Sequence, residues 1–378
     1  MSYFERLRFE KSPNNEIILS AMEVVKKFII KNKLILYGGM AMDLALRLKN
    51  QSIYPDDEIP DYDFMSPTHH IHAYKLADIL VSKGFTDVHV INAIHITTMK
   101  IRVMGEWVAD ISYIPDCIYK NIETLNYKGL NVTHPYHSVM DQASALSRPF
   151  DESPREVIFA RWEKDNTRMK LILDTYPPEE SKFSDEMHEY KYKASNKNEV
   201  LLGWPALLAH KNNSVKKPIQ IPEEKPFSMI KVIPKKWVKK YNRMLDAPPV
   251  YECEDSIYMH ADGIQYVVNK IGKLTIASIP MLIWFFLHRY IYYQDNWAYE
   301  GFVETIKLCG DYGIDSIFGD ESVSNSDKYQ KVKFFSKPQD ATPRNAYYKN
   351  YTEVPKKQYD WTPSMSEWFK VDGLEHSD

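Results

Sequence analysis

Three short groups of residues in the first third of the chain have types and spacings that suit metal-assisted phosphate chemistry. They are Gly38-Gly39, the pair Asp61 and Asp63, and the single carboxylate Asp110. Residues two apart in a strand point to the same face, so we expect Asp61 and Asp63 to project side by side. Two carboxylates ~4 Å apart repel by about 4 kcal/mol at an effective dielectric of ~20, and solvent, a shared proton or a cation must offset that cost.

Asp110 lies between Ala109 and Ile111 in a second predicted strand. If the two strands are neighbours, three carboxylates converge, and such oxygen clusters suit Mg²⁺ or Mn²⁺. Two metal ions can activate an attacking hydroxyl and neutralise a triphosphate leaving group. A Gly-Gly turn allows close backbone approach, and the helix after it offers free N–H groups to phosphate. The set therefore predicts a nucleotidyltransferase acting on a nucleoside triphosphate and a nucleic-acid end.

Each signal also has a plainer interpretation when it is taken alone. A lone Gly-Gly is usually a turn, and a lone Asp-x-Asp is usually a solvated loop, like the acidic residues 56–58 just before it. The order of the three signals and their apolar flanks favour the catalytic interpretation.

The elements that must position these residues follow from hydrophobic periodicity. Residues 34–37 predict a strand that the Gly-Gly turn ends, and 62–65 predict the strand that carries the paired carboxylates. Residues 94–103 and 106–114 predict two strands joined by a turn at Met104-Gly105. Helices are predicted over residues 15–30, 40–48, 71–82, 139–146 and 154–175, with a polar loop at 50–60. The prediction is an α/β (α+β) fold with a mixed sheet and flanking helices.

The motifs resemble those of a known superfamily. A strand, a Gly-Gly turn, Asp-x-Asp and a later Asp resemble the nucleotidyltransferase superfamily first described in DNA polymerase beta. Residues 61–67 (DYDFMSP) and 107–112 (WVADIS) resemble the poly(A) polymerase catalytic subunits of large nucleocytoplasmic DNA viruses. So do residues 140–142 (MDQ), Arg148-Pro149 and 161–168 (RWEKDNTR). The resemblance covers about residues 30–175, and one departure is the insert at 50–60, a candidate rim loop or partner contact.

The resemblance implies template-independent addition of adenylate from ATP to an RNA 3′ end. It implies that Asp61 and Asp63 bind two Mg²⁺ or Mn²⁺ ions, and that Asp110 binds the catalytic metal and helps to activate the 3′-hydroxyl. Gly38 and Gly39 would hold the triphosphate. It also implies either a stimulatory processivity subunit or a homodimer, and action in the host cytoplasm with packaging in the virion.

Basic residues provide further candidates for binding triphosphate or RNA. Arg161, Lys164 and Arg168 are spaced to lie close to one helix face, where a solvated face paired with nearby acids is the alternative. A basic helix is predicted over 235–245, with Trp237 and Tyr241 able to stack on a base; a solvated lysine face is equally compatible. His69, His70 and His72 lack partners at metal-ligand spacing, so we do not assign them to a metal site.

Length and composition limit the remaining possibilities. The 378 residues favour a catalytic domain over 1–180, a second α/β domain over 181–320 that contributes to an RNA groove, and a polar tail over 321–378. The resemblance to the viral family implies that the second domain is a candidate degenerate copy of the first. A net charge of −3 gives no global nucleic-acid signature, so binding must use local basic surface. Three scattered cysteines predict a reducing compartment without a disulfide or zinc framework.

The apolar run at 276–287 is too short to cross a bilayer, so we expect a buried helix and no membrane partner. Two alternatives to polyadenylation stay open. One keeps the fold with another acceptor or nucleotide, and the other is a catalytically idle RNA-binding subunit of a polyadenylation complex.

Overall fold

The computed structural model describes residues 15–55, 60–93, 97–147, 155–180, 186–193, 199–222, 229–233, 250–253, 256–260 and 268–312. The predicted helix 235–245 and the predicted tail 321–378 lie outside these residues. Contacts divide the chain into two compact units built from alternating stretches of sequence. Unit 1 comprises Met1–Gln142, Thr167–Glu179 and Leu287–Ala298, and unit 2 comprises Ala143–Asn166, Glu180–Phe286 and Tyr299–Asp378. The predicted domain limits at residues 180 and 320 stay predictions.

Unit 1 is built on a seven-stranded mixed sheet with the order β3-β4-β5-β2-β1-β7-β6. Its strands are β1 (Ile35–Leu36), β2 (Tyr62–Ser66), β3 (Val88–Asn92), β4 (Thr98–Val103), β5 (Glu106–Tyr113), β6 (Thr124–Tyr127) and β7 (Leu130–Thr133). The predicted α/β fold with a mixed sheet is confirmed. The sequence analysis did not predict β3 or the β6–β7 hairpin, and the strand expected over 94–103 begins only at Thr98.

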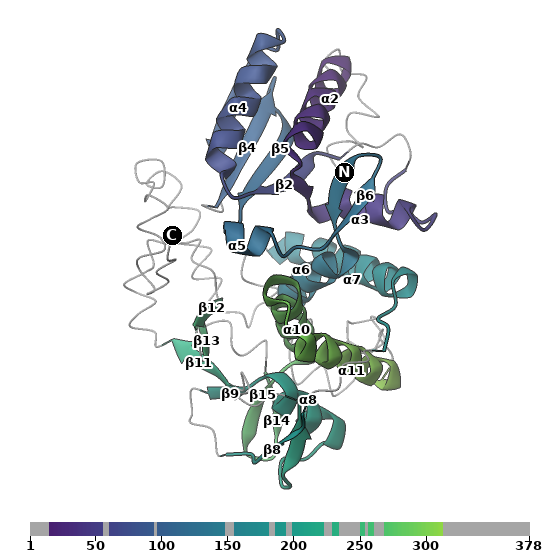
Figure 1. Ribbon diagram of the computed structural model, residues 1–378, viewed down its shortest axis with the longest axis vertical. Coiled ribbons are helices and arrows are strands. Elements are labelled where there is room, and N and C mark those ends of the chain that lie inside the picture. The colour runs from purple at the N-terminus through teal and green to yellow at the C-terminus, as the bar shows by residue number, and fades with distance from the viewer. Residues whose placement is uncertain are drawn as a thin grey trace. The chain divides into compact units, whose positions relative to one another are not determined.

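Helices cover one face of this sheet. The helices in the first part of the chain are α2 (Asn15–Asn32), α3 (Gly38–Arg47), α4 (His69–Ser82), α5 (Asp116–Tyr119), α6 (Pro135–Ser147) and α7 (Arg155–Thr175). Helices α2 and α4 lie side by side along the sheet near β4 and β5 (Figure 1). Their apolar residues share one core with Phe64 of β2 and Ile111 of β5. Because side chains alternate along a strand, Asp63 and Asp110 project from the opposite face.

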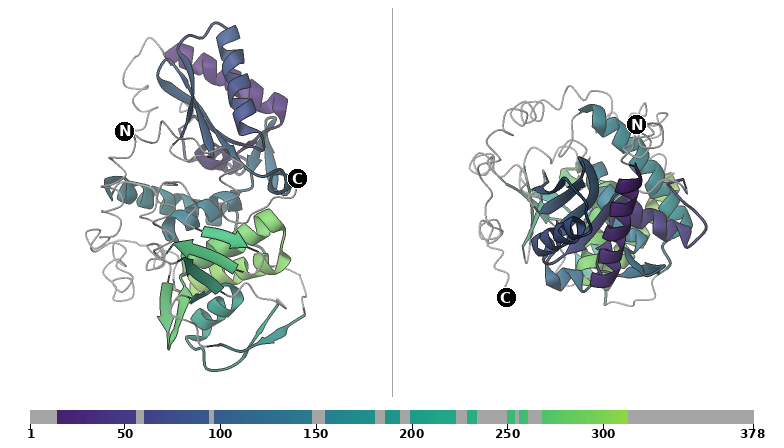
Figure 2. Two further views of the ribbon diagram at one scale, coloured as in Figure 1. Left: turned by 90° about the vertical axis from the view of Figure 1, so that its left-hand side faces the viewer. Right: turned by 90° about the horizontal axis from the view of Figure 1, so that it is seen from above.

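Unit 2 contains a six-stranded sheet with the order β12-β13-β11-β9-β15-β14. The strands of this unit are β8 (His188–Tyr190), β9 (Glu199–Leu201), β10 (Ile219–Ile221), β11 (Met229–Ile233), β12 (Val250–Cys253), β13 (Ser256–His260), β14 (Val268–Ile271) and β15 (Leu274–Ala277). Strands β8 and β10 form a separate antiparallel pair. The later helices are α8 (Gly203–Asn212), α10 (Ile279–Tyr293) and α11 (Asn296–Tyr312), and Figure 2 shows these elements from two further sides.

The six strands of the unit 2 sheet pair in the same sequence of directions as six of the seven strands of the unit 1 sheet. From β4 to β6 the neighbouring pairs in unit 1 are antiparallel, parallel, antiparallel, parallel and antiparallel. From β12 to β14 the pairs in unit 2 follow the same sequence of directions. In both units the strand at the same place in this order, β1 or β9, leads directly into a ten-residue helix that starts with glycine. The second sheet therefore has the topology expected of a copy of the first.

The described helices include none that is long and apolar enough to cross a membrane.

Candidate active site

Parallel pairing of β2 with β5 brings the predicted carboxylates together. The register places Asp63 directly beside Asp110, and Asp61 lies immediately before the first residue of β2. One carboxylate oxygen from each of the three residues lies within 4.8 Å of the others. Among the described residues, this is the group of His, Cys, Asp or Glu side chains that could hold a metal ion.

The electrostatics of this triad (Asp61, Asp63 and Asp110) show that its negative charges are poorly compensated by the protein. Burial raises the pKa of Asp63 well above its usual value, and the charges of Asp61 and Asp110 raise it further. Burial and the charge of Asp110 also raise the pKa of Asp61. Three clustered, half-buried carboxylates are a donor set that a hard divalent cation satisfies, so the triad can hold a divalent metal.

A lysine that the sequence analysis did not select also reaches the triad. Lys100 of β4 is the register partner of Asp110 and forms an ion pair with its carboxylate. Its ammonium group lowers the pKa of both Asp61 and Asp63, against the larger effect of burial. The Lys100 Nζ atom also lies 4.8 Å from the centroid of the Trp107 ring, which helps to hold it in place.

The Gly-Gly turn lies directly against the carboxylates. Tyr37 is extended, and Gly38 has φ +71°, a left-handed conformation that favours glycine. A Cβ at Gly38 would lie 2.7 Å from Oδ2 of Asp63, so the backbone approaches this carboxylate closely. The Tyr37 N–H donates to the Asp63 carbonyl oxygen at 3.0 Å. The free N–H groups at the start of α3 therefore lie next to the triad, where a phosphate can accept hydrogen bonds from them.

The three predicted basic residues all belong to α7, but the structure relates only one of them to the Gly-Gly turn. Arg168 donates from Nη2 to the hydroxyl oxygen of Tyr54 at 3.2 Å, and a Cβ at Gly39 would overlap that same hydroxyl. Lys164 is exposed, and the side chain of Arg161 lies outside the described part of the chain. Tyr54 comes from the insert at 50–60 and was not selected from the sequence. The roles of all these residues stay predictions.

His69, His70 and His72 lie in the first turn of α4. Burial, together with the charge of His70, lowers the pKa of His69 to about 4. Nδ1 of His72 is 2.6 Å from Oγ of Ser66. None of the three histidines belongs to a potential metal group in the region that the structure describes.

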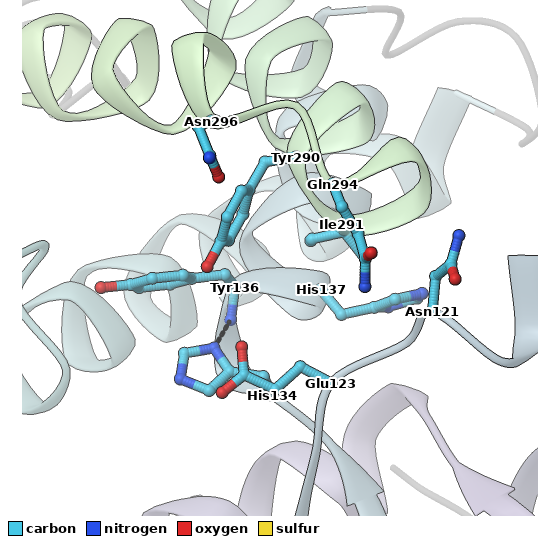
Figure 3. Close-up of a pocket in the computed structure, with 9 residues that line it drawn as sticks. All are labelled: Asn121, Glu123, His134, Tyr136, His137, Tyr290, Ile291, Gln294 and Asn296. Atoms are coloured by element: carbon cyan, nitrogen blue, oxygen red, sulfur yellow. Dashed lines mark hydrogen bonds between the residues drawn. The ribbon is translucent and has the colours of Figure 1, made fainter. Parts of the chain in front are cut away.

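A cavity of about 430 Å³ lies in unit 1 between the β6–β7 region and the end of α10 (Figure 3). It is lined by Asn121, Glu123, His134, Tyr136, His137, Tyr290, Ile291, Gln294 and Asn296. The backbone N–H of Tyr136 donates to Nδ1 of His134 at 3.3 Å, the dashed line in Figure 3. The lining includes one carboxylate and neither lysine nor arginine, so it is less suited to phosphate than the Gly-Gly turn is.

The sheet topology, the Gly-Gly turn and the carboxylate triad together define a nucleotidyltransferase-like fold. Residues 23–152 match the family model for the poly(A) polymerase catalytic subunit. The resemblance to this viral family that the motifs predicted is therefore confirmed.

The chain is 48% identical over 177 residues to the protein of African swine fever virus described as "Putative poly(A) polymerase catalytic subunit", which covers 47% of this chain and 37% of that protein. It is 33% identical over 161 residues to a protein of Acanthamoeba polyphaga mimivirus with the same description, covering 42% and 27% of the two chains. The matches thus span 37% and 27% of these relatives' own length.

The fold also matches the crystal structure of the Megavirus polyadenylate synthase, with a TM-score of 0.62 and 18% identity. This match covers 99% of the present chain and 87% of the Megavirus chain. The likeness of fold therefore extends well beyond residues 23–152, which match the family model.

Proposed function

We propose that the chain is a metal-dependent polynucleotide adenylyltransferase that adds AMP from ATP to RNA 3′ ends without a template. The observation that carries this proposal is the convergence of Asp61, Asp63 and Asp110 beside the Gly38-Gly39 turn. The family match over residues 23–152 and the names of the viral relatives support the choice of reaction.

In this proposal Asp61 and Asp63 hold two Mg²⁺ or Mn²⁺ ions, and Asp110 holds one of them. Bound divalent cations would lower the pKa of the RNA 3′-hydroxyl and neutralise charge on the triphosphate. The Gly-Gly turn presents the N-terminal N–H groups of α3 to the phosphates and fixes their orientation. Lys100 limits the repulsion among the carboxylates by its ion pair with Asp110.

The reaction forms a bond between the RNA 3′-oxygen and the α-phosphorus of ATP. It breaks the bond between that phosphorus and the oxygen that bridges the α- and β-phosphates. Pyrophosphate leaves, and the hydroxyl proton passes to Asp110 or to solvent. Since no covalent enzyme intermediate is needed, the contribution of the protein is positioning and charge stabilisation.

An extension assay tests this proposal. Purified protein, labelled oligoadenylate RNA and Mg²⁺ or Mn²⁺ are combined with each of the four nucleoside triphosphates, and products are resolved on a denaturing gel. We expect a metal-dependent ladder with ATP that is absent from Asp61→Asn/Asp63→Asn. The matched control is Asp116→Asn, which removes an exposed carboxylate that pairs with Lys120 one helical turn away.

The same assay separates the alternatives. A ladder with another nucleotide, or nucleotide transfer without RNA, would identify a different acceptor or donor. Absence of a ladder from folded wild-type protein under both metals, with RNA binding intact, would identify a non-catalytic subunit.

We also propose that processivity depends on self-association or on a stimulatory subunit, and that the protein acts in the host cytoplasm and is packaged in the virion. The catalytic-subunit description of the matched family supports a partner, and the viral relatives support the location. The solution mass with and without RNA, and immunoblots of cytoplasm and purified particles, test these points.

A further inference from the structure

Ile53 and Tyr54, in the described part of the insert at 50–60, are anchored to the helix that follows the Gly-Gly turn. Oδ1 of Asp43 in α3 accepts hydrogen bonds from the backbone N–H groups of Ile53 and Tyr54, at 2.8 and 3.0 Å. Arg47, one turn later in α3, donates from Nε to Oδ2 of Asp43 at 2.5 Å and from Nη2 to the Tyr54 carbonyl oxygen at 2.9 Å. Asp43 is only 3% exposed, so these charge-assisted bonds are shielded from solvent. The backbone of Tyr54 is therefore held in a defined place.

This anchor directs the side chain of Tyr54 over the second glycine of the turn. A Cβ at Gly39 would overlap the Tyr54 hydroxyl oxygen, whereas the nearest ring carbon, Cζ, would lie 3.4 Å away. From the other side, Arg168 donates to the hydroxyl at 3.2 Å, and its guanidinium carbon lies 5.3 Å from the ring centroid. The hydroxyl thus lies between the arginine and the turn that is expected to hold phosphate.

The hydrogen-bond roles leave the phenol able to bind an anion. Because Arg168 can only donate, the Tyr54 oxygen accepts, and the phenol proton remains available for another acceptor. Burial raises the pKa of Tyr54 and outweighs the lowering effect of Arg168, and the charges of Asp63 and Asp61 raise it a little further, so the hydroxyl keeps its proton near neutral pH. A neutral donor held by a fixed cation beside free backbone N–H groups suits a phosphate oxygen.

We propose that Tyr54 is a substrate-positioning residue: its hydroxyl donates a hydrogen bond to a non-bridging oxygen of the nucleotide triphosphate above Gly38-Gly39, and Arg168 orients the hydroxyl and supplies positive charge. This inference rests on the proposed function, because it assigns the triphosphate to that turn. It gives the insert a role in nucleotide binding that the three motifs do not contain.

Binding measurements test the contact independently of catalysis. The probes are α,β-methylene-ATP with Mg²⁺, inorganic tripolyphosphate with Mg²⁺, and AMP, titrated into wild type, Tyr54→Phe and the exposed control Tyr74→Phe. A hydrogen bond to a charged group predicts about tenfold weaker binding of both polyphosphates to Tyr54→Phe. AMP binding, and all binding to Tyr74→Phe, should stay within about twofold of wild type. Unchanged polyphosphate affinity in Tyr54→Phe would overturn the proposal, and tighter affinity would show that the hydroxyl blocks the site.

A double variant tests the placement of Tyr54 through stability alone. Gly39→Ala should lower the melting temperature because the new Cβ overlaps the hydroxyl, and adding Tyr54→Phe should restore most of the loss. Absence of rescue would show that the side chain does not lie over Gly39 and would overturn the inference.

The extension assay distinguishes this failure from failure of the proposed function. Wild-type tailing with an unchanged KM for ATP in Tyr54→Phe contradicts only the Tyr54 assignment. Polyphosphate binding that depends on Tyr54, in a wild type that makes no tail with any nucleotide, contradicts only the polyadenylation proposal.

Discussion

Units 1 and 2 carry sheets with the same strand order and directions, but the corresponding turns are built differently. In unit 1 the turn before α3 reads Gly38-Gly39, and both glycines are closely approached by side chains near the carboxylate triad. In unit 2 the turn before α8 reads Gly203-Trp204, and Gly203 also has a left-handed backbone, with φ +63°. Trp204 is buried and packs edge-on against Phe286, with ring centroids 6.0 Å apart.

The strands of the two units share a register at this turn, which aligns Leu36 with Phe64 in unit 1 and Leu201 with Met229 in unit 2. Asp61 and Asp63 come just before Phe64, whereas the residues just before Met229 lie outside the described part of the chain. The turn before α3 thus lies beside clustered carboxylates, and the turn before α8 carries a buried tryptophan. Function on this fold depends on a few side chains and not on the topology.

The largest effect is expected when a negative charge is removed from the triad of unit 1. Asp63→Asn should lower the tailing rate on the order of 10³-fold, because a metal ligand is lost from the centre of the site. The metal-free variant should be no less stable than wild type, since the exchange relieves repulsion with Asp61 and Asp110. Rates come from extension gels and stability from thermal melts in a chelator. A rate within tenfold of wild type would contradict the assignment of the site.

The counterpart in unit 2 is Trp204→Ala, which should affect stability instead of chemistry. Loss of a large buried aromatic side chain costs about 3 kcal/mol. Burial raises the pKa of the Cys309 thiol to about 12 and makes it unreactive, so its labelling reports opening of unit 2. We expect faster modification of Cys309, located by peptide mass analysis, and a tailing rate per folded molecule within about threefold of wild type. A loss as large as that of Asp63→Asn would give unit 2 a direct chemical role.

A matched pair of glycine substitutions compares the two turns directly. Gly38→Ala and Gly203→Ala both place a side chain on a left-handed backbone, at a cost of about 1–2 kcal/mol in unfolding free energy. Only Gly38→Ala adds a close contact with Asp63, so only this variant should also lose tailing activity, by about tenfold or more. Equal effects of the two exchanges on activity would show that the turns are equivalent in function.

The smallest expected effect is a pH dependence that belongs to unit 1. His69 is buried with its pKa lowered to about 4, so the folded state binds a proton less readily than the unfolded state. Its stabilising contribution, on the order of 1 kcal/mol, is therefore present above pH ~6.5 and is lost as the pH falls from ~6.5 to ~4. In denaturant titrations, His69→Gln should flatten this slope. A slope that survives in His69→Gln would assign the titration to another group.

Local patterns in the sequence were sufficient to predict most of the parts of the site. Alternation placed Asp63 and Asp110 on polar faces of strands, since Phe64 and Ile111 enter the core on the other side. The Gly-Gly pair predicted a turn with unusual backbone geometry, because glycine alone adopts it without strain. The β6–β7 hairpin and β3 were missed although apolar residues alternate along them, because each strand has only four or five residues.

Tertiary structure decided which of these parts meet. Asp63 and Asp110 are adjacent because β2 and β5 pair in parallel, and no local pattern encodes the register of two strands so far apart in sequence. A one-residue shift in the β4–β5 ladder places Lys100 opposite Asp110, whereas the register at the Met104-Gly105 turn would place it opposite Ala109. Tyr54 reaches Gly39 and Arg168 only because Asp43 anchors the insert. The sequence by itself determined which residue types were available and which faces they occupy, since these depend on local backbone periodicity. Their convergence into one site depends on long-range pairing and burial, which exist only in the folded chain.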